Sequence, residues 1–139
     1  MTLDLYQVDA FTNQLFKGNP AAVVPLTTWL PDKTMQAIAA ENNLAETAFI
    51  VPKGADFELR WFTPAIEVRL CGHATLATAF VLFDQLNYQE EQIRFHTKSG
   101  ILTVKQENDF LIMDFPTDEL EAVNISEIAQ KGLGAKIEA

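Results

Sequence analysis

The stretch RLCGHATLATAFVLF, residues 69–83, decides how this chain is expected to fold. It places the only cysteine, a glycine and one of the two histidines immediately before a run that is almost entirely apolar. The length and spacing predict a helix over 72–86, and a helix with hardly any polar face is buried on all sides. We therefore expect Leu76, Ala77 and Phe80 to lie in the core.

Short segments typical of strands flank this helix on both sides. In them, β-forming residues alternate with polar ones or run apolar between turns rich in Gly, Pro, Asn and Asp. The segments are residues 3–10, AAVVPL (21–26), TAFIV (47–51), FELRWF (57–62), IEVRL (66–70), QIRFH (92–96), GILTVKQ (100–106) and FLIMDF (110–115).

Two further helices are predicted. One spans residues 31–43 and places Met35, Ile38, Ala39 and Asn42 on one face. The other is short and covers residues 125–132. One long buried helix among many short strands implies an α+β fold, in which a curved antiparallel sheet or partial β-barrel closes around a central buried helix.

Length, composition and charge restrict the class of protein. With 139 residues, 48% of them hydrophobic, the chain has room for one domain with its own core, so residues 1–139 are taken as a single unit. A net charge of −9 argues against nucleic acids and anionic membranes as partners. A single cysteine favours a reducing compartment, and we expect a cytoplasmic protein. No targeting signal or membrane-spanning apolar run is recognised.

The start of the predicted 72–86 helix is the first candidate site. Its first turn has unpaired backbone N–H groups, and the helix dipole favours an anion such as a carboxylate there. Gly72 permits a close backbone approach, and the dipole favours a neutral imidazole at His73 that can donate to or accept from a ligand. Equally, Cys71 could be a small core residue, and His73 could bond only to a nearby loop.

Glu46 is the second candidate. It follows a predicted helix end and precedes an apolar strand, and its neighbours are almost all uncharged. A partly desolvated carboxylate is suited to proton transfer. The alternative is an exposed glutamate at the entry to a strand. His96, at a polar position of an alternating strand, is expected to face solvent.

Three ordered motifs together carry a resemblance. They are LFKGNPAAVV (15–24), NNLAETAF (42–49) and FTPAIEVRLCGHATLATA (62–79). In this order and with these gaps they resemble the PhzF-like family, the phenazine-biosynthesis isomerases and their relatives. The likeness extends from Asp9 to Phe115 and Pro116, and three ordered motifs are far more specific than any one alone.

The resemblance implies a fold similar to that of diaminopimelate epimerase, with two lobes that each wrap a sheet around a central helix. It implies that Glu46 is a proton-transfer acid and base and that His73 lines the same pocket, so the two side chains should be neighbours. The backbone amides of Gly72 and Ala74 would face a substrate carboxylate. Cys71 would lie at the edge of the pocket, where a stabilised thiolate is chemically possible.

The implied function is that of a cofactor-independent isomerase or epimerase acting on a small carboxylate-bearing metabolite. Asn19 is a further candidate for lining the pocket. The resemblance implies neither an organic cofactor nor a metal. A zinc site is also not indicated by the residues, because Cys71, His73 and scattered carboxylates offer fewer fixed ligands than zinc usually needs.

The resemblance implies that residues 1–139 correspond to the N-terminal lobe only, with the second lobe of the family absent from this sequence. We therefore expect a homodimer, since a second copy could cover the surface that a second lobe would cover. The alternative is a non-catalytic lobe that binds a small acid or a protein partner.

Overall fold

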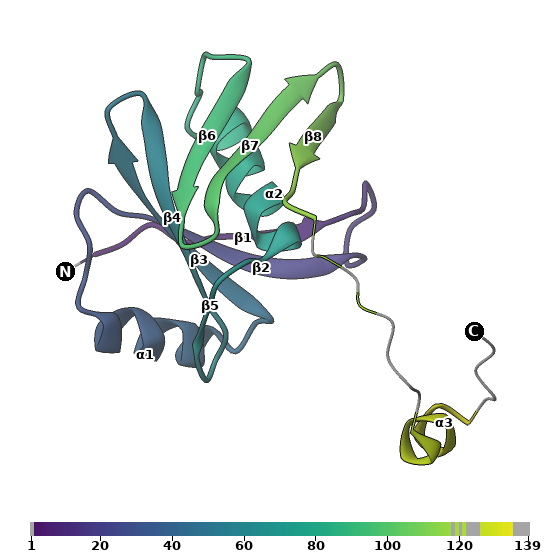
Figure 1. Ribbon diagram of the computed structural model, residues 1–139. Coiled ribbons are helices and arrows are strands. Elements are labelled where there is room, and N and C mark those ends of the chain that lie inside the picture. Colours follow the sequence, from purple (N-terminus) through teal and green to yellow (C-terminus); the bar gives the residue numbers. More distant parts are fainter. Residues whose placement is uncertain (1, 118, 120, 122–125, 135–139) are drawn as a thin grey trace.

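An eight-stranded sheet curls around one helix in the computed structural model, which describes residues 2–117, 119, 121 and 126–134 (Figure 1). The strands are β1 (Tyr6–Ala10), β2 (Asn19–Pro25), β3 (Glu46–Lys53), β4 (Asp56–Phe62), β5 (Glu67–Val68), β6 (Gln92–Thr97), β7 (Gly100–Glu107) and β8 (Phe110–Asp114). The helices are α1 (Asp32–Asn42), α2 (Gly72–Phe80), a π-helical turn η1 (Val81–Gln85) and α3 (Glu127–Leu133). The predicted α+β class is confirmed.

The sheet is mixed rather than wholly antiparallel. Its order is β1-β2-β3-β4-β6-β7-β8, with β5 paired to β4. β2 pairs in parallel with β3, and β4 pairs in parallel with β6. The expectation of an antiparallel sheet was wrong at these two places, because each parallel pair is joined by a crossover that contains a helix, α1 in the first case and α2 in the second.

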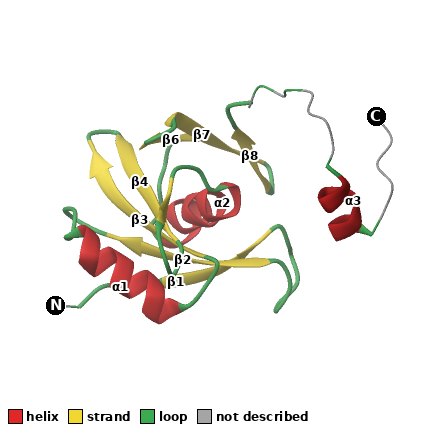
Figure 2. Ribbon diagram, turned by 60° about the horizontal axis from the view of Figure 1, so that its bottom comes forward, coloured by secondary structure: helices red, strands yellow, loops and turns green. Residues whose placement is uncertain are grey.

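Side chains alternate along the strands and build two cores. Inward residues such as Val23, Ile50 and Trp61 pack against α2 in the hollow of the sheet. Outward residues, including Phe49, pack against Met35 of α1 on the other face. Figure 2 shows α2 enclosed by the curled sheet and α1 outside it. α3 has no buried residue.

The central helix is shorter and less enclosed than the sequence predicted. Regular α-helix ends at Phe80, and the chain continues through η1 to Gln85. Ala77 is fully buried and Leu76 partly so, but Phe80 is 42% exposed. The prediction of Phe80 in the core was wrong, because the half-barrel encloses only part of the circumference of the helix. No helix among the described residues is long and apolar enough to cross a membrane.

An ion-pair network fixes the segment that leads into α2. The Arg60 guanidinium donates to both carboxylate oxygens of Glu67, at 2.8 and 2.9 Å, and Lys98 reaches the same carboxylate. Ser99 Oγ donates to the carbonyl oxygen of Arg69 at 2.8 Å. β4, β5 and the β6–β7 turn are thereby tied together just before Cys71.

The charge of Glu67 is predicted to contribute to stability in a pH-dependent way. Hydrogen bonds from Arg60, and then from Lys98, lower the pKa of Glu67 from 4.5 to about 2. This stabilisation is therefore present above pH 4.5 and is lost as the pH falls toward about 2. We expect Glu67→Gln to lower the free energy of unfolding by about 1 to 2 kcal/mol near neutral pH.

Urea unfolding at a series of pH values measures this difference, which should shrink as the pH falls below 4.5. Glu41→Gln removes the same charge from an exposed position on α1 and serves as the control. A constant difference between the Glu67→Gln variant and the wild type at all pH values would contradict the assignment.

Candidate active site

Glu46 is placed by the junction between α1 and β3. The α1 helix ends at Asn42, and the left-handed backbone of Asn43 (φ 50°) turns the chain toward the sheet. Asn42 Nδ2 donates to Thr47 Oγ1 at 3.1 Å and ties the helix end to the strand start. Glu46 is the first residue of β3 and pairs with Ala21 of the parallel strand β2.

Cys71 and His73 are placed by the first turn of α2. Cys71 has an extended backbone and precedes the helix, and its carbonyl oxygen accepts from both the amide and the hydroxyl of Thr75. His73 is only 8% exposed. α2 packs against β2 and β3. The contact between His73 and Glu46, the first residue of β3, places this turn beside the start of that strand.

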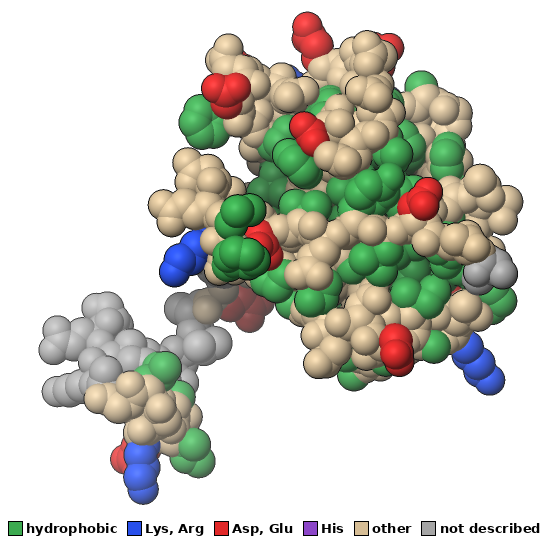
Figure 3. Space-filling view, turned by 180° about the vertical axis from the view of Figure 1, so that it is seen from behind, with side chains coloured by type: hydrophobic (Ala, Val, Ile, Leu, Met, Phe, Trp, Pro, Cys, Tyr) green, Lys and Arg blue, Asp and Glu red, His purple; other side chains and the backbone are tan. Residues whose placement is uncertain are grey.

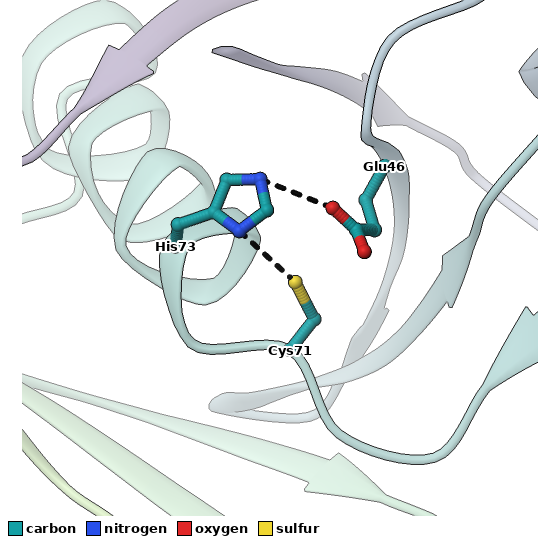
Figure 4. A group of neighbouring side chains, drawn as sticks. All are labelled: Glu46, Cys71 and His73. Atoms are coloured by element: carbon teal, nitrogen blue, oxygen red, sulfur yellow. Dashed lines mark hydrogen bonds and ion pairs between the residues drawn. The ribbon is translucent and has the colours of Figure 1, made fainter. Parts of the chain in front are cut away.

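Glu46, Cys71 and His73 converge at this point (Figure 4). His73 Nε2 lies 3.1 Å from Glu46 Oε2, and His73 Nδ1 lies 3.4 Å from Cys71 Sγ. The prediction that Glu46 and His73 are neighbours is confirmed. The three side chains therefore form a chain of carboxylate, imidazole and thiol.

The facing atoms of Glu46 and His73 are buried but poorly satisfied. Although they lie at ion-pair distance, neither Glu46 Oε2 nor His73 Nε2 has a partner among the described residues with regular hydrogen-bond geometry. Buried polar atoms are usually hydrogen-bonded, and exceptions often mark functional sites. These two atoms therefore have hydrogen-bonding capacity that the described residues do not use.

Cys71 holds a protonated thiol in this site. Burial raises its pKa from 9.0 to about 11, and the nearby Glu46 carboxylate adds to the rise. The backbone amides of Ala74 and His73 act in the opposite direction but do not outweigh burial. The dipole argument for a stabilised thiolate is thus wrong for this cysteine, because desolvation is the larger effect.

The other predicted site residues lie near the same end of the fold. Gly72 and Ala74 belong to the first turn of α2, and Asn19 starts β2 two residues before the partner of Glu46. A Cβ atom on Gly72 would meet Met113 and Phe115 at ordinary contact distances of 3.7 and 3.8 Å, so packing does not require glycine there.

Sequence reasoning missed Met113 and Phe115 as neighbours of the site. The alternation of β8 marks Met113 as an inward residue, but which inward residues border the helix start depends on the curvature of the sheet. His96 lies in β6, where it is partly buried and its Nε2 is 2.7 Å from Asp56 Oδ2. It is therefore not simply a solvent-facing residue, and it is not part of the cluster.

Two hollows on the surface lie away from this cluster. One, of about 630 Å³, is lined by residues 55–56 and 88–92, and the other, of about 250 Å³, by residues around Phe80 and Phe110. Neither is lined by Glu46, Cys71 or His73. The chemistry of the cluster, rather than the size of a hollow, identifies the candidate site.

The same three residues are the potential metal ligands of the cluster. Their ligand atoms lie within 4.8 Å of one another. The two short contacts, however, use different nitrogens of His73, and a single ion binds only one of them. Binding of one ion would require the ring or the thiol to turn, so the observed arrangement fits proton exchange better than metal binding.

Comparison with known proteins identifies the family. The family model described as phenazine biosynthesis-like protein (PhzC-PhzF) matches residues 8–138. The chain belongs to the PhzF family. An uncharacterized isomerase of Pseudomonas aeruginosa is 57% identical over 121 residues, which are 87% of this chain and 47% of the relative. The chain spans about half the length of the curated relatives it matches.

Solved structures of PhzF proteins share the fold. A PhzF-family protein of Enterococcus faecalis superposes with a TM-score of 0.90 at 50% identity, over 99% of this chain and 53% of that one. A predicted epimerase of Pseudomonas aeruginosa matches 79% of this chain and 41% of its own, with a TM-score of 0.66 and 26% identity. The expected likeness to PhzF proteins and to epimerase-like folds is confirmed.

Slow thiol labelling is predicted for this PhzF-family chain. Cys71 is the only cysteine, so labelling reports on this site alone. A pKa of about 11 instead of 9.0 lowers the thiolate fraction at mildly alkaline pH about 100-fold. We expect the native protein to react with a disulfide reagent at least about 100-fold more slowly than the urea-unfolded chain, and to react faster as the pH rises toward 11. Equal rates for the native and unfolded protein would contradict a buried neutral thiol.

Proposed function

We propose that this chain acts as a cofactor-independent isomerase or epimerase on a small carboxylate-bearing metabolite. The observation that carries the proposal is the convergence of Glu46 and His73 at the start of α2, with facing atoms that are buried and lack regular hydrogen bonds. Membership of the PhzF family and the similarity to uncharacterized isomerases support the same reaction class.

In the proposed reaction, Glu46 takes a proton from a carbon next to an activating group. The C–H bond breaks, its electron pair is delocalised into that group, and the protonated carboxyl then returns the proton to give the isomer. His73 hydrogen-bonds the substrate beside Glu46. The backbone amides of Gly72 and Ala74 bind the substrate carboxylate at the positive end of α2, with Cys71 and Asn19 at the edge of the pocket.

Deuterium incorporation tests the role of Glu46. We would incubate the protein in heavy water with a panel of chiral and unsaturated carboxylic acids and follow the loss of individual C–H signals by NMR. Where the wild type catalyses exchange, Glu46→Gln should reduce the rate at least about 100-fold, because the substitution is nearly isosteric and removes the titrating group.

Glu41→Gln is the matched control, since it makes the same change at an exposed position, and it should exchange at the wild-type rate. Undiminished exchange in Glu46→Gln would refute the assignment. Binding of an acid without any exchange in the wild type would instead support a non-catalytic binding lobe.

We further propose that the chain forms a cytoplasmic homodimer. Hydrophobic side chains gather on the face shown in Figure 3. Phe11, Leu15 and Phe16, in the loop between β1 and β2, are 69%, 84% and 93% exposed. Large exposed apolar groups of this kind usually mark an interaction surface. The loop lies at the same end of the sheet as Glu46, because β2 starts beside the start of β3.

A second copy that covers this loop would bring two candidate sites toward one cleft. Sedimentation equilibrium at micromolar concentration should therefore give twice the 15.5 kDa of the chain. Phe16→Glu should weaken the dimer at least about tenfold, because it places a charge in the buried interface. Phe110→Glu, at an exposed position of β8, is the control for a non-specific loss of apolar surface. A wild-type monomer would refute the dimer.

A further inference from the structure

The ring of His73 lies between two polar groups, and its interaction with each depends on which ring nitrogen carries the proton. Nδ1 faces Cys71 Sγ at 3.4 Å, and Nε2 faces Glu46 Oε2 at 3.1 Å. A neutral imidazole carries one proton, so one nitrogen donates while the other accepts. The tautomer therefore decides whether His73 presents a donor or an acceptor beside Glu46.

The contact with Glu46 favours a proton on Nε2. An ionised carboxylate can only accept, so an unprotonated Nε2 would place two lone pairs 3.1 Å apart in a buried site. A neutral ring therefore carries its single proton on Nε2, toward Glu46.

The contact with Cys71 requires the same tautomer. Burial raises the pKa of Cys71 to about 11, so its sulfur carries a proton and is a weak donor. That donor needs an acceptor, and Nδ1 is the ring atom in contact with it. The backbone of Cys71 is fixed because its carbonyl oxygen accepts from the Thr75 hydroxyl.

We propose that Cys71 is a positioning residue that sets the tautomer of His73. Its S–H group donates to Nδ1 and keeps the single ring proton on Nε2, where it faces Glu46. No bond forms or breaks at the sulfur. The tautomer does not depend on the proposed function. Only its catalytic use does, in which the Nε2 proton hydrogen-bonds negative charge that develops on a substrate.

Nitrogen NMR of histidine-labelled protein, recorded near neutral pH without substrate, tests the proposal. We expect His73 to show a protonated Nε2 and an unprotonated, hydrogen-bonded Nδ1. Cys71→Ala should shift the Nδ1 signal toward that of a nitrogen without a donor and populate the other tautomer. Cys71→Ser should restore the wild-type pattern, because a hydroxyl also donates. The chain has two histidines, so His96, which pairs with Asp56, is an internal control that should not change.

A protonated Nδ1 in the wild type, or His73 signals that do not change in Cys71→Ala, would overturn the proposal. Where exchange of substrate protons is observed, Cys71→Ala should lower kcat about tenfold with KM unchanged, and Cys71→Ser should recover it. A kcat that stays at the wild-type value while the tautomer changes would refute the catalytic use of the Nε2 proton. If the tautomer is as expected but no substrate exchanges, the proposed function fails and the assignment of Cys71 stands.

Discussion

Burial of α2 in the hollow of the curled sheet is the constraint on which the rest of the structure depends. The helix can lie close to the strands because its inward positions carry small side chains. Ala74, Ala77 and Ala79 are fully buried, and the buried hydroxyls of Thr75 and Thr78 bond to carbonyl oxygens one turn back. Larger residues at these positions would push the helix away from the sheet and separate Cys71 and His73 from Glu46.

The parallel pairing of β2 with β3 is the second feature of the fold that positions the site. It places the starts of both strands at the same end of the sheet, so that Glu46 and Asn19 lie toward the N-terminus of α2. An antiparallel pairing would have put these two residues at opposite ends. α1 makes the parallel pairing possible, because it carries the chain back along the outer face of the sheet.

Desolvation gives the cluster its chemical character. The dipole of α2 and nearby backbone amides favour a thiolate at Cys71, yet burial outweighs them and keeps the thiol neutral. The same low-dielectric setting strengthens the interaction between Glu46 and His73 and makes their unsatisfied atoms costly without a ligand. A site of this kind holds protons at defined atoms and is suited to moving them.

The sequence by itself determined the α+β class and the position of nearly every strand, and it singled out the candidate residues of the site. These follow from local patterns: the alternation of side chains, the turn residues, and motifs that put Glu46 after a helix and Cys71, Gly72 and His73 at the start of another. The meeting of Glu46 and His73 was foreseen through family resemblance, since spacing alone left both with ordinary alternatives. Only the tertiary structure decided the two parallel strand pairs, the exposure of Phe80 and the protonated state of Cys71, because each depends on how far the sheet curls and which groups it removes from water.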